Sequence, residues 1–194
     1  MSSRKPPARR RNAAATRMAI LASARKAFAR VGYDGAGVRE IAGGAGVTAM
    51  LVNRYFGSKE KLFAEVVAGT MADPVILTPE VLGAGRPGAA IAAALVGLTA
   101  TGATPLDGFL IMLRSASSER AAQIARAEIE KHHQKTMACA LKGRHAAQRA
   151  GVVLSLVAGL QVMRQLIGLG ALAKAEPQTL IRVLAPVLDA LLEP

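Results

Sequence analysis

Apolar residues recur at three- and four-residue steps along most of the chain, which is the spacing of one face of an α-helix. The first such stripe predicts a helix over residues 16–31. Its members are Met18, Leu21, Ala24, Phe28 and Val31. No segment alternates apolar and polar positions as a half-buried strand does. The pattern therefore predicts an all-α protein.

Glycine and proline positions separate the remaining helices. "VGYDGAG" ends the first helix, and short helices follow over residues 38–44 and 48–55, with a fourth capped by Ser58. "ADPVILTPEVLGAGRPG" marks a boundary near residues 73–88. Beyond it we expect helices over 88–101, 105–115, 118–141, 144–170 and 177–192, the last kinked at Pro186. The chain thus divides into a basic, disordered arm (1–15), a small helical head (16–72) and a larger helical domain (73–194).

The positive charge is concentrated in the first third of the chain. Residues 1–72 carry 13 Lys and Arg against four Asp and Glu, whereas residues 73–194 carry 12 against nine. Most of the net charge of +12 therefore belongs to the arm and the head. Such asymmetry indicates a polyanionic partner, either nucleic acid or an anionic membrane surface.

Two features bear on the compartment. The single cysteine, Cys139, excludes an intrachain disulfide framework and is expected to be a small buried apolar residue, which fits a cytoplasmic location. "GVVLSLVAGLQVMRQLIGLGALA" is long enough to cross a bilayer, but a central arginine such as Arg164 costs about 2.5–3.5 kcal/mol on insertion scales. We therefore expect a buried or interface helix and no membrane partner.

The main candidate motif is "VREIAGGAGVTAMLVNRYF", two short helices separated by a tight turn. A helix-turn-helix needs a small residue where its helices touch, which Ala42 supplies, and a glycine in the turn, which Gly46 supplies. The inward apolar positions are Ile41, Ala45, Val47, Val52 and Tyr55. The alternative is an ordinary helical hairpin. An acid-free second helix in a basic region favours a helix that enters the major groove of double-stranded DNA.

Three of the six phenylalanine and tyrosine residues, Tyr55, Phe56 and Phe63, lie within nine positions of one another. We expect them to form the core of the head rather than platforms on which bases stack. A head this small needs aromatic side chains because each of them buries a large apolar area.

A run of about fifty residues, "ILASARKAFARVGYDGAGVREIAGGAGVTAMLVNRYFGSKEKLFAEVV", resembles the DNA-binding head of the tetracycline-repressor (TetR) family of bacterial transcriptional regulators. The resemblance implies a three-helix helix-turn-helix head followed by a helical domain for effector binding and dimerisation. The implied partners are a palindromic DNA operator, a second copy of the chain and a small-molecule effector, with no cofactor. The implied location is the cytoplasm, in association with the nucleoid.

The resemblance also implies DNA contacts for individual residues of the head. Thr48 would cap the recognition helix and contact a phosphate, and Arg39 would lie near the DNA backbone on the support helix. The full set is Arg39, Thr48, Ala49, Met50, Asn53, Arg54 and Lys59. Two positions depart from the family pattern. Gly37 replaces a serine or threonine, and Asn53 replaces a phosphate-binding tyrosine, so Asn53 either reads an adenine or only replaces that phosphate contact.

Two interpretations are open for Lys59, and two for the arm. Lys59 lies in the first turn of a helix, where the dipole disfavours a cation unless a phosphate binds there, so it is either a phosphate ligand or a solvated lysine. Arg9, Arg10 and Arg11 either reach a minor groove or the phosphates, or belong to a solubilising tail.

The larger domain offers two further candidate sites. The family implies a dimer interface between its last two long helices, and the alternative is packing within one chain; the candidates are Leu156, Leu160, Met163, Ile167, Val183 and Val187. An effector pocket is assigned from composition to Phe109, Met112, Leu113 and Met137. The adjacent His132 and His133 point about 100° apart on a helix, and no zinc spacing exists, so no metal site is predicted.

Three function classes remain to be compared. An enzyme is disfavoured because the chain has no phosphate-cradling glycine loop, no nucleophile beside a base and no carboxylate pair in a motif. A low-specificity architectural DNA-binding protein is the alternative, favoured by Gly37 and Asn53. The prediction is a homodimeric, ligand-responsive repressor, whose operator, regulated genes and effector the sequence does not identify.

Overall fold

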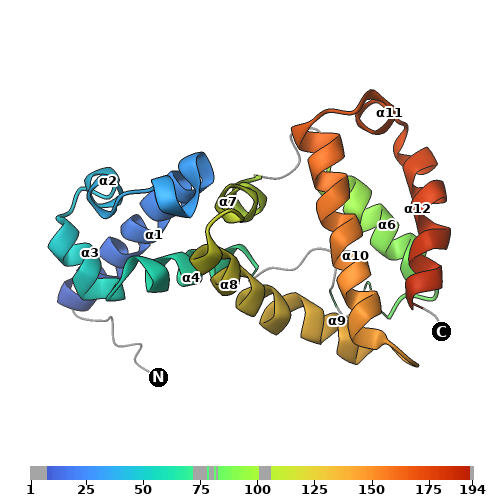
Figure 1. The fold of residues 1–194 in the computed structure, drawn as a ribbon, viewed down its shortest axis with the longest axis horizontal. Coiled ribbons are helices and arrows are strands. Elements are labelled where there is room, and N and C mark those ends of the chain that lie inside the picture. The colour runs from blue at the N-terminus through green and yellow to red at the C-terminus, as the bar shows by residue number, and fades with distance from the viewer. Residues whose placement is uncertain (1–7, 72–77, 79–80, 82, 101–105, 193–194) are drawn as a thin grey trace, which may run out of the picture. The chain divides into compact units, whose positions relative to one another are not determined.

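The structure of the protein is a computed structural model that describes residues 8–71, 78, 81, 83–100 and 106–192 (Figure 1). Every regular element in this part of the chain is a helix, which confirms the all-α prediction. The chain forms two compact units. Unit 1 comprises residues 1–70 and 106–128, and unit 2 comprises residues 71–105 and 129–194.

Unit 1 begins with α1 (Ala8–Gly35), α2 (Val38–Gly44), α3 (Ala49–Phe56) and α4 (Lys59–Thr70), which lie together in Figure 1. The helices after α1 match the predicted ones to within a residue or two. However, α1 starts at Ala8, so the prediction of a disordered arm is wrong for residues 8–15. The last proline of the arm is Pro7, and the alanines and arginines that follow are strong helix formers.

Aromatic side chains fill the core of unit 1, as predicted. Phe28 and Phe63 are fully buried, and their ring centroids lie 5.0 Å apart in an edge-to-face arrangement. Tyr33 completes this cluster, 5.0 Å from Phe63. Phe56 is buried as well, whereas Tyr55 is only half-buried. These rings are the largest buried side chains of unit 1, and aliphatic residues such as Ile20, Ile41 and Leu62 are buried in the same unit.

The apolar stripe of α1 is rotated from the predicted one. Ala24 and Phe28 are buried as expected, but Met18 is 64% exposed and Val31 is 37% exposed. Ile20 and Ala27 take their places in the core. Both stripes have helical spacing, and the alanine-rich sequence does not distinguish them because alanines occupy both faces.

Helices α7 (Asp107–Ser115) and α8 (Glu119–Ile129) follow much later in the sequence, yet α7 packs along α1. The two helices approach tightly at Gly32, where α1 leaves helical geometry at φ 70° and ψ −175° and a Cβ would overlap the Arg114 carbonyl oxygen. The Arg114 guanidinium donates to the carbonyls of Ala29 and Arg30, and the Tyr33 amide donates to Ser115 Oγ at 2.9 Å. The last turn of α7 thus replaces backbone hydrogen bonds that the kink removes from α1.

Unit 2 contains α6 (Pro87–Leu98), α9 (Lys135–Ala140), α10 (Ala146–Gln161), α11 (Gly170–Ala173) and α12 (Pro177–Leu192). A π-helical turn, η1 (Glu130–Gln134), precedes α9 within the predicted helix 118–141, and η2 (Val162–Leu166) extends α10. The short helix α11 was not predicted. The core of unit 2 lies between α6, α10 and α12 and includes Ile91, Leu95, Val153 and Leu188.

A buried arginine secures the end of α6. Arg164 of η2 is only 9% exposed and donates through Nη1 to the Val96 carbonyl and to Thr99 Oγ1, both at 2.7 Å. Thr99 in turn donates to the Leu95 carbonyl. The guanidinium charge therefore sits at the negative end of the α6 dipole, where a cation is stabilised.

Gly32→Ala is expected to destabilise the protein by about 1–3 kcal/mol. Its backbone conformation is one that essentially only glycine adopts, and a Cβ there would collide with the Arg114 carbonyl. The measurement is urea unfolding followed by circular dichroism. The matched control is Gly69→Ala in α4, where a Cβ meets nothing within 4 Å and the substitution should stabilise by about 0.5–1 kcal/mol. Equal unfolding midpoints for the two variants would contradict the role assigned to Gly32.

Candidate nucleic-acid interface

The turn between α2 and α3 is a Schellman motif, a common way for a helix to end at a glycine. Gly46 adopts φ 66°, the Val47 amide donates to the Ala42 carbonyl at 3.0 Å, and the Gly46 amide donates to the Gly43 carbonyl at 3.1 Å. A Cβ on Gly46 would meet nothing within 4 Å, so the dihedral angle alone requires a glycine. The predicted roles of Gly46 in the turn and of the small, buried Ala42 are confirmed.

The second helix of the motif, α3, starts from a defined cap. Thr48 has an extended backbone, and its Oγ1 accepts a hydrogen bond from the Leu51 amide at 3.3 Å. Val52 and Phe56 are 2% and 5% exposed, so this face of the helix is fixed in the core of unit 1. Because α3 is only eight residues long, its cap and its buried face together determine how it is held.

The opposite face of α3 is exposed. Met50 is 80% exposed, and Asn53 and Arg54 are exposed as well. These positions are three and four residues apart and therefore share one side of the helix. Ala49 is half-buried beside them. The helix contains no acidic residue. This face is chemically suited to a polyanion and offers an apolar group, an amide and a guanidinium.

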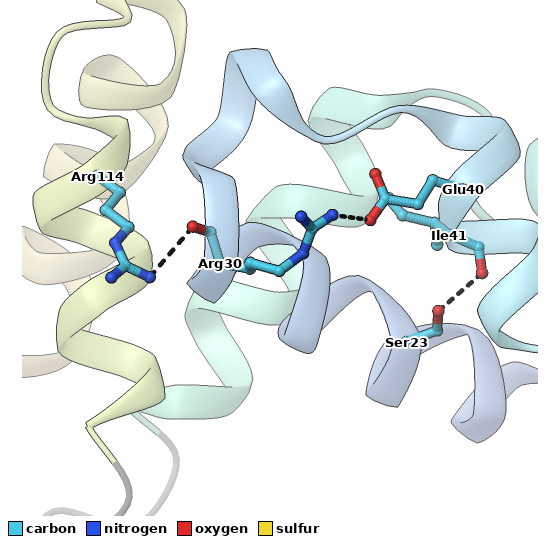
Figure 2. Close-up of polar contacts among 5 residues, drawn as sticks. All are labelled: Ser23, Arg30, Glu40, Ile41 and Arg114. Carbon is cyan, nitrogen blue, oxygen red and sulfur yellow. Dashed lines mark hydrogen bonds and ion pairs between the residues drawn. The ribbon is translucent and has the colours of Figure 1, made fainter.

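Helix α2 is anchored to α1 by polar contacts shown in Figure 2. Ser23 Oγ donates to the Ile41 carbonyl at 2.8 Å, and Arg30 forms an ion pair with Glu40. The ion pair neutralises the single acid of α2, while Arg39 remains exposed. Gly37 lies at the N-cap of α2 and supplies no side-chain cap. Arg39 is thus available to a phosphate, and sequence reasoning had not identified the two anchoring contacts.

Lys59 has a partner within its own chain. Its Nζ lies 4.5 Å from the centroid of the Tyr33 ring, and Ser58, the predicted cap of α4, accepts from the Lys61 amide at 3.2 Å. Burial and then the Glu60 carboxylate raise the pKa of the Tyr33 hydroxyl, so the ring stays neutral and attracts the ammonium. A phosphate contact for Lys59 stays a prediction.

Arg9, Arg10 and Arg11 lie in the first turn of α1, but their side chains are outside the described residues. Their predicted contacts with DNA therefore remain predictions.

The residues assigned to an effector pocket occur in both units. Phe109, Met112 and Leu113 belong to α7 in unit 1, where Phe109 and Met112 are half-buried and Leu113 is exposed. Met137 belongs to unit 2 and is fully buried in its core. The pocket remains a prediction for these four residues.

Most residues assigned to the dimer interface are exposed within one chain. Met163 is 46% exposed, Ile167 65%, Val183 64% and Val187 48%, whereas Leu156 is half-buried and Leu160 is buried. Three further exposed apolar residues on or beside the same helices were missed: Val152, Leu166 and Leu169. The stretch Ala146–Leu166 is also long and apolar enough to cross a membrane by length and composition alone, and little of it is buried in the single chain.

Cys139 is exposed, so the expectation of a buried apolar cysteine is wrong. It lies on α9, whose inward position is taken by Met137 instead. Within the described part of the chain, no group of three or more His, Cys, Asp or Glu residues could hold a metal ion. Burial, followed by the charge of His132, lowers the pKa of His133.

Comparisons with known proteins agree with this geometry. Residues 20–66 match the family model described as bacterial regulatory proteins of the tetR family, and residues 86–192 match the tetracyclin repressor-like C-terminal domain. No curated protein matches the chain.

Solved structures share the whole fold. A TetR-family regulator from Streptomyces coelicolor is 25% identical, with 98% of this chain and 99% of that chain covered at a TM-score of 0.60. GusR of Salmonella enterica is 14% identical at a TM-score of 0.72, with 91% and 95% covered. AibR, solved in complex with isovaleryl coenzyme A and operator DNA, is 17% identical at a TM-score of 0.61, with 90% and 98% covered.

Thr48→Ala is expected to lower the free energy of unfolding by about 1 kcal/mol, because the Leu51 amide loses its hydrogen-bond acceptor at the start of α3. Thr48→Ser keeps the hydroxyl and should stay within about 0.5 kcal/mol of the wild type. Urea unfolding of the three proteins checks this expectation. If the alanine and serine variants are equally stable, the cap does not stabilise the motif.

Proposed function

Since the chain belongs to the TetR family of bacterial regulatory proteins, we propose that it is a sequence-specific transcriptional regulator, a homodimeric repressor released from a palindromic operator by a small-molecule effector. The observation that carries the proposal is the division of α3 into two faces. One face is fixed in the core by Val52 and Phe56, and the other presents Met50, Asn53 and Arg54 to the exterior without any acid.

DNA binding requires a basic surface and a rigid reading element, and unit 1 has both. Arg39 and Arg54 are exposed on α2 and α3, while Glu40 and Glu65 are neutralised by Arg30 and Arg17. Arg39 and Arg54 thus add positive charge to both helices of the motif, which attracts phosphates. The first residues of α3 are the ones that reach base edges when such a helix lies in the major groove.

A homodimer is supported by the exposed apolar residues of unit 2. Helices α10 and α12 contact each other. Large apolar side chains are exposed on η2 and directly after it, at Met163 and Ile167, and on α12, at Val183 and Val187. A second copy of the chain would cover these residues. The charged residue of η2, Arg164, points away from them because it is hydrogen-bonded at the end of α6. Two heads about one helical turn apart would then read a palindrome.

An effector is supported by the match of residues 86–192 to the tetracyclin repressor-like C-terminal domain. AibR, which shares the fold, was solved with isovaleryl coenzyme A and operator DNA together. For this chain we assign the effector pocket to Phe109, Met112, Leu113 and Met137. We place the protein in the cytoplasm, associated with the nucleoid.

A low-specificity architectural role is the second candidate. It is favoured by Gly37, which leaves the start of α2 without a side-chain cap or a hydroxyl for a phosphate. The two functions differ in the ratio of specific to non-specific affinity at a stated salt concentration.

Sequencing of genomic fragments retained by the purified protein at about 150 mM salt tests the proposed function. We expect an enriched palindrome whose half-sites lie about one helical turn apart, since each dimer would place two α3 helices in successive major grooves. Recovery of fragments without any common motif would favour the architectural role instead.

Val183→Glu is expected to convert the dimer to a monomer, because a charge would have to be buried without a partner in the interface. The molar mass in solution, measured by light scattering after size-exclusion chromatography, checks this outcome. Met18→Glu is the matched control, since Met18 is equally exposed, at 64%, but lies on α1 in unit 1. A Val183→Glu variant that keeps the dimer mass would exclude this face as the interface.

A further inference from the structure

Met50 is the most exposed large apolar side chain in the described part of the protein, at 80%. It lies in the first turn of α3, directly after Ala49. A long apolar side chain at this position contributes nothing to the core, whose α3 residues are Val52 and Phe56. We therefore interpret Met50 as part of a surface that contacts a partner.

We propose that Met50 is a specificity-determining residue that contacts the 5-methyl group of a thymine in each half-site of the operator. This inference rests on the proposed function, because it deepens the role of the same helix. It adds a base preference that the family membership does not supply.

The major groove offers a thioether only one apolar partner. Each base edge there presents hydrogen-bond donors and acceptors, and thymine alone adds a methyl group. Against a G·C pair, Met50 would displace water from polar edges without replacing the lost hydrogen bonds, which is unfavourable. Against thymine, two apolar groups leave water together, and the flexible, polarisable methionine side chain can adjust to the methyl group.

The neighbouring side chains support the same base preference. Asn53 lies one turn further along the exposed face, about 4.5 Å along the helix axis from Met50. Both side chains therefore project from the same exposed face of α3 and would meet bases of the same half-site. The amide of Asn53 can bind the N6 and N7 atoms of adenine. Together they predict A·T pairs within each half-site.

The charge around Met50 identifies DNA rather than a protein as its partner. Arg54 shares the exposed face of α3, Arg39 is exposed on α2, and α3 has no acid. An apolar protein partner would have to bury these guanidinium groups, which is costly, whereas a DNA groove places phosphates beside them.

The test uses the full-length protein and the operator duplex recovered from genomic fragments. Each thymine of a half-site is replaced in turn by deoxyuridine, which removes the methyl group and keeps every hydrogen-bonding group. For the wild type we expect one thymine per half-site at which the replacement lowers affinity about fourfold, the value of one methyl group leaving water. For Met50→Ala we expect equal affinity for the thymine and uracil duplexes at that position.

Asn53→Ala is the matched control. It removes another side chain from the same exposed face and should keep the sensitivity to the thymine methyl group. Circular dichroism melting curves of Met50→Ala should equal those of the wild type, since Met50 is not buried.

Two outcomes would overturn the inference while leaving the proposed function intact. One is a sequence-specific protein that tolerates uracil at every thymine, and the other is a thymine sensitivity that Met50→Ala retains. A protein that binds all duplexes equally would contradict the proposed function itself, and Met50 would then read no base.

Discussion

The kink of α1 at Gly32 is the constraint on which the arrangement of unit 1 depends. It ends the long helix with a backbone conformation that leaves carbonyls and an amide without helical partners, and such groups are costly to bury unpaired. The C-terminal turn of α7 supplies those partners through Arg114 and Ser115, more than 80 residues away in sequence. The chain can then turn into α2, which carries the reading helix α3. The geometry of the DNA-contacting motif is thus set partly by a helix that lies far outside it in the sequence.

The motif could be predicted because it depends on local chemistry, whereas the long-range packing of unit 1 could not be predicted. The Schellman turn, the Thr48 cap and the Ser58 cap each depend on residues within five positions, so the sequence of the head specifies them directly. The placement of α7 in unit 1 depends on Gly32 meeting Arg114, which no local pattern indicates. The alanine-rich helices were equally ambiguous about their buried faces, which is why Met18 and Cys139 were assigned to the interior although both are exposed.

Unit 2 combines a buried charge with exposed apolar residues on the same stretch of helix. Arg164 is held at the end of α6, where the helix dipole and Thr99 stabilise its guanidinium. Two and three positions later, the apolar residues Leu166 and Ile167 remain in water within one chain. A hydrogen-bonded arginine fixes the rotation of η2 and thereby determines which side chains face outward. The exposed apolar face is therefore a consequence of the same contact that secures the core, and it is the face that we propose a second copy of the chain covers.

Helix α3 likewise has one face that packs in the core and one face that is exposed. Its inward residues, Val52 and Phe56, hold the helix, so its outward residues are free to be chosen for recognition alone. Phosphate contacts by arginines set affinity for any DNA, but they do not distinguish one sequence from another. Direct discrimination between bases comes from side chains that meet base edges, and the exposed uncharged side chains of this helix are Met50 and Asn53. The Met50 thioether and the Asn53 amide disfavour different bases. Contact with a polar base edge is unfavourable for the thioether, and contact with an edge that lacks matching donors and acceptors is unfavourable for the amide. In the interface we propose, the two side chains would exclude different wrong bases, so that a helix of only eight residues would be selective at more than one position.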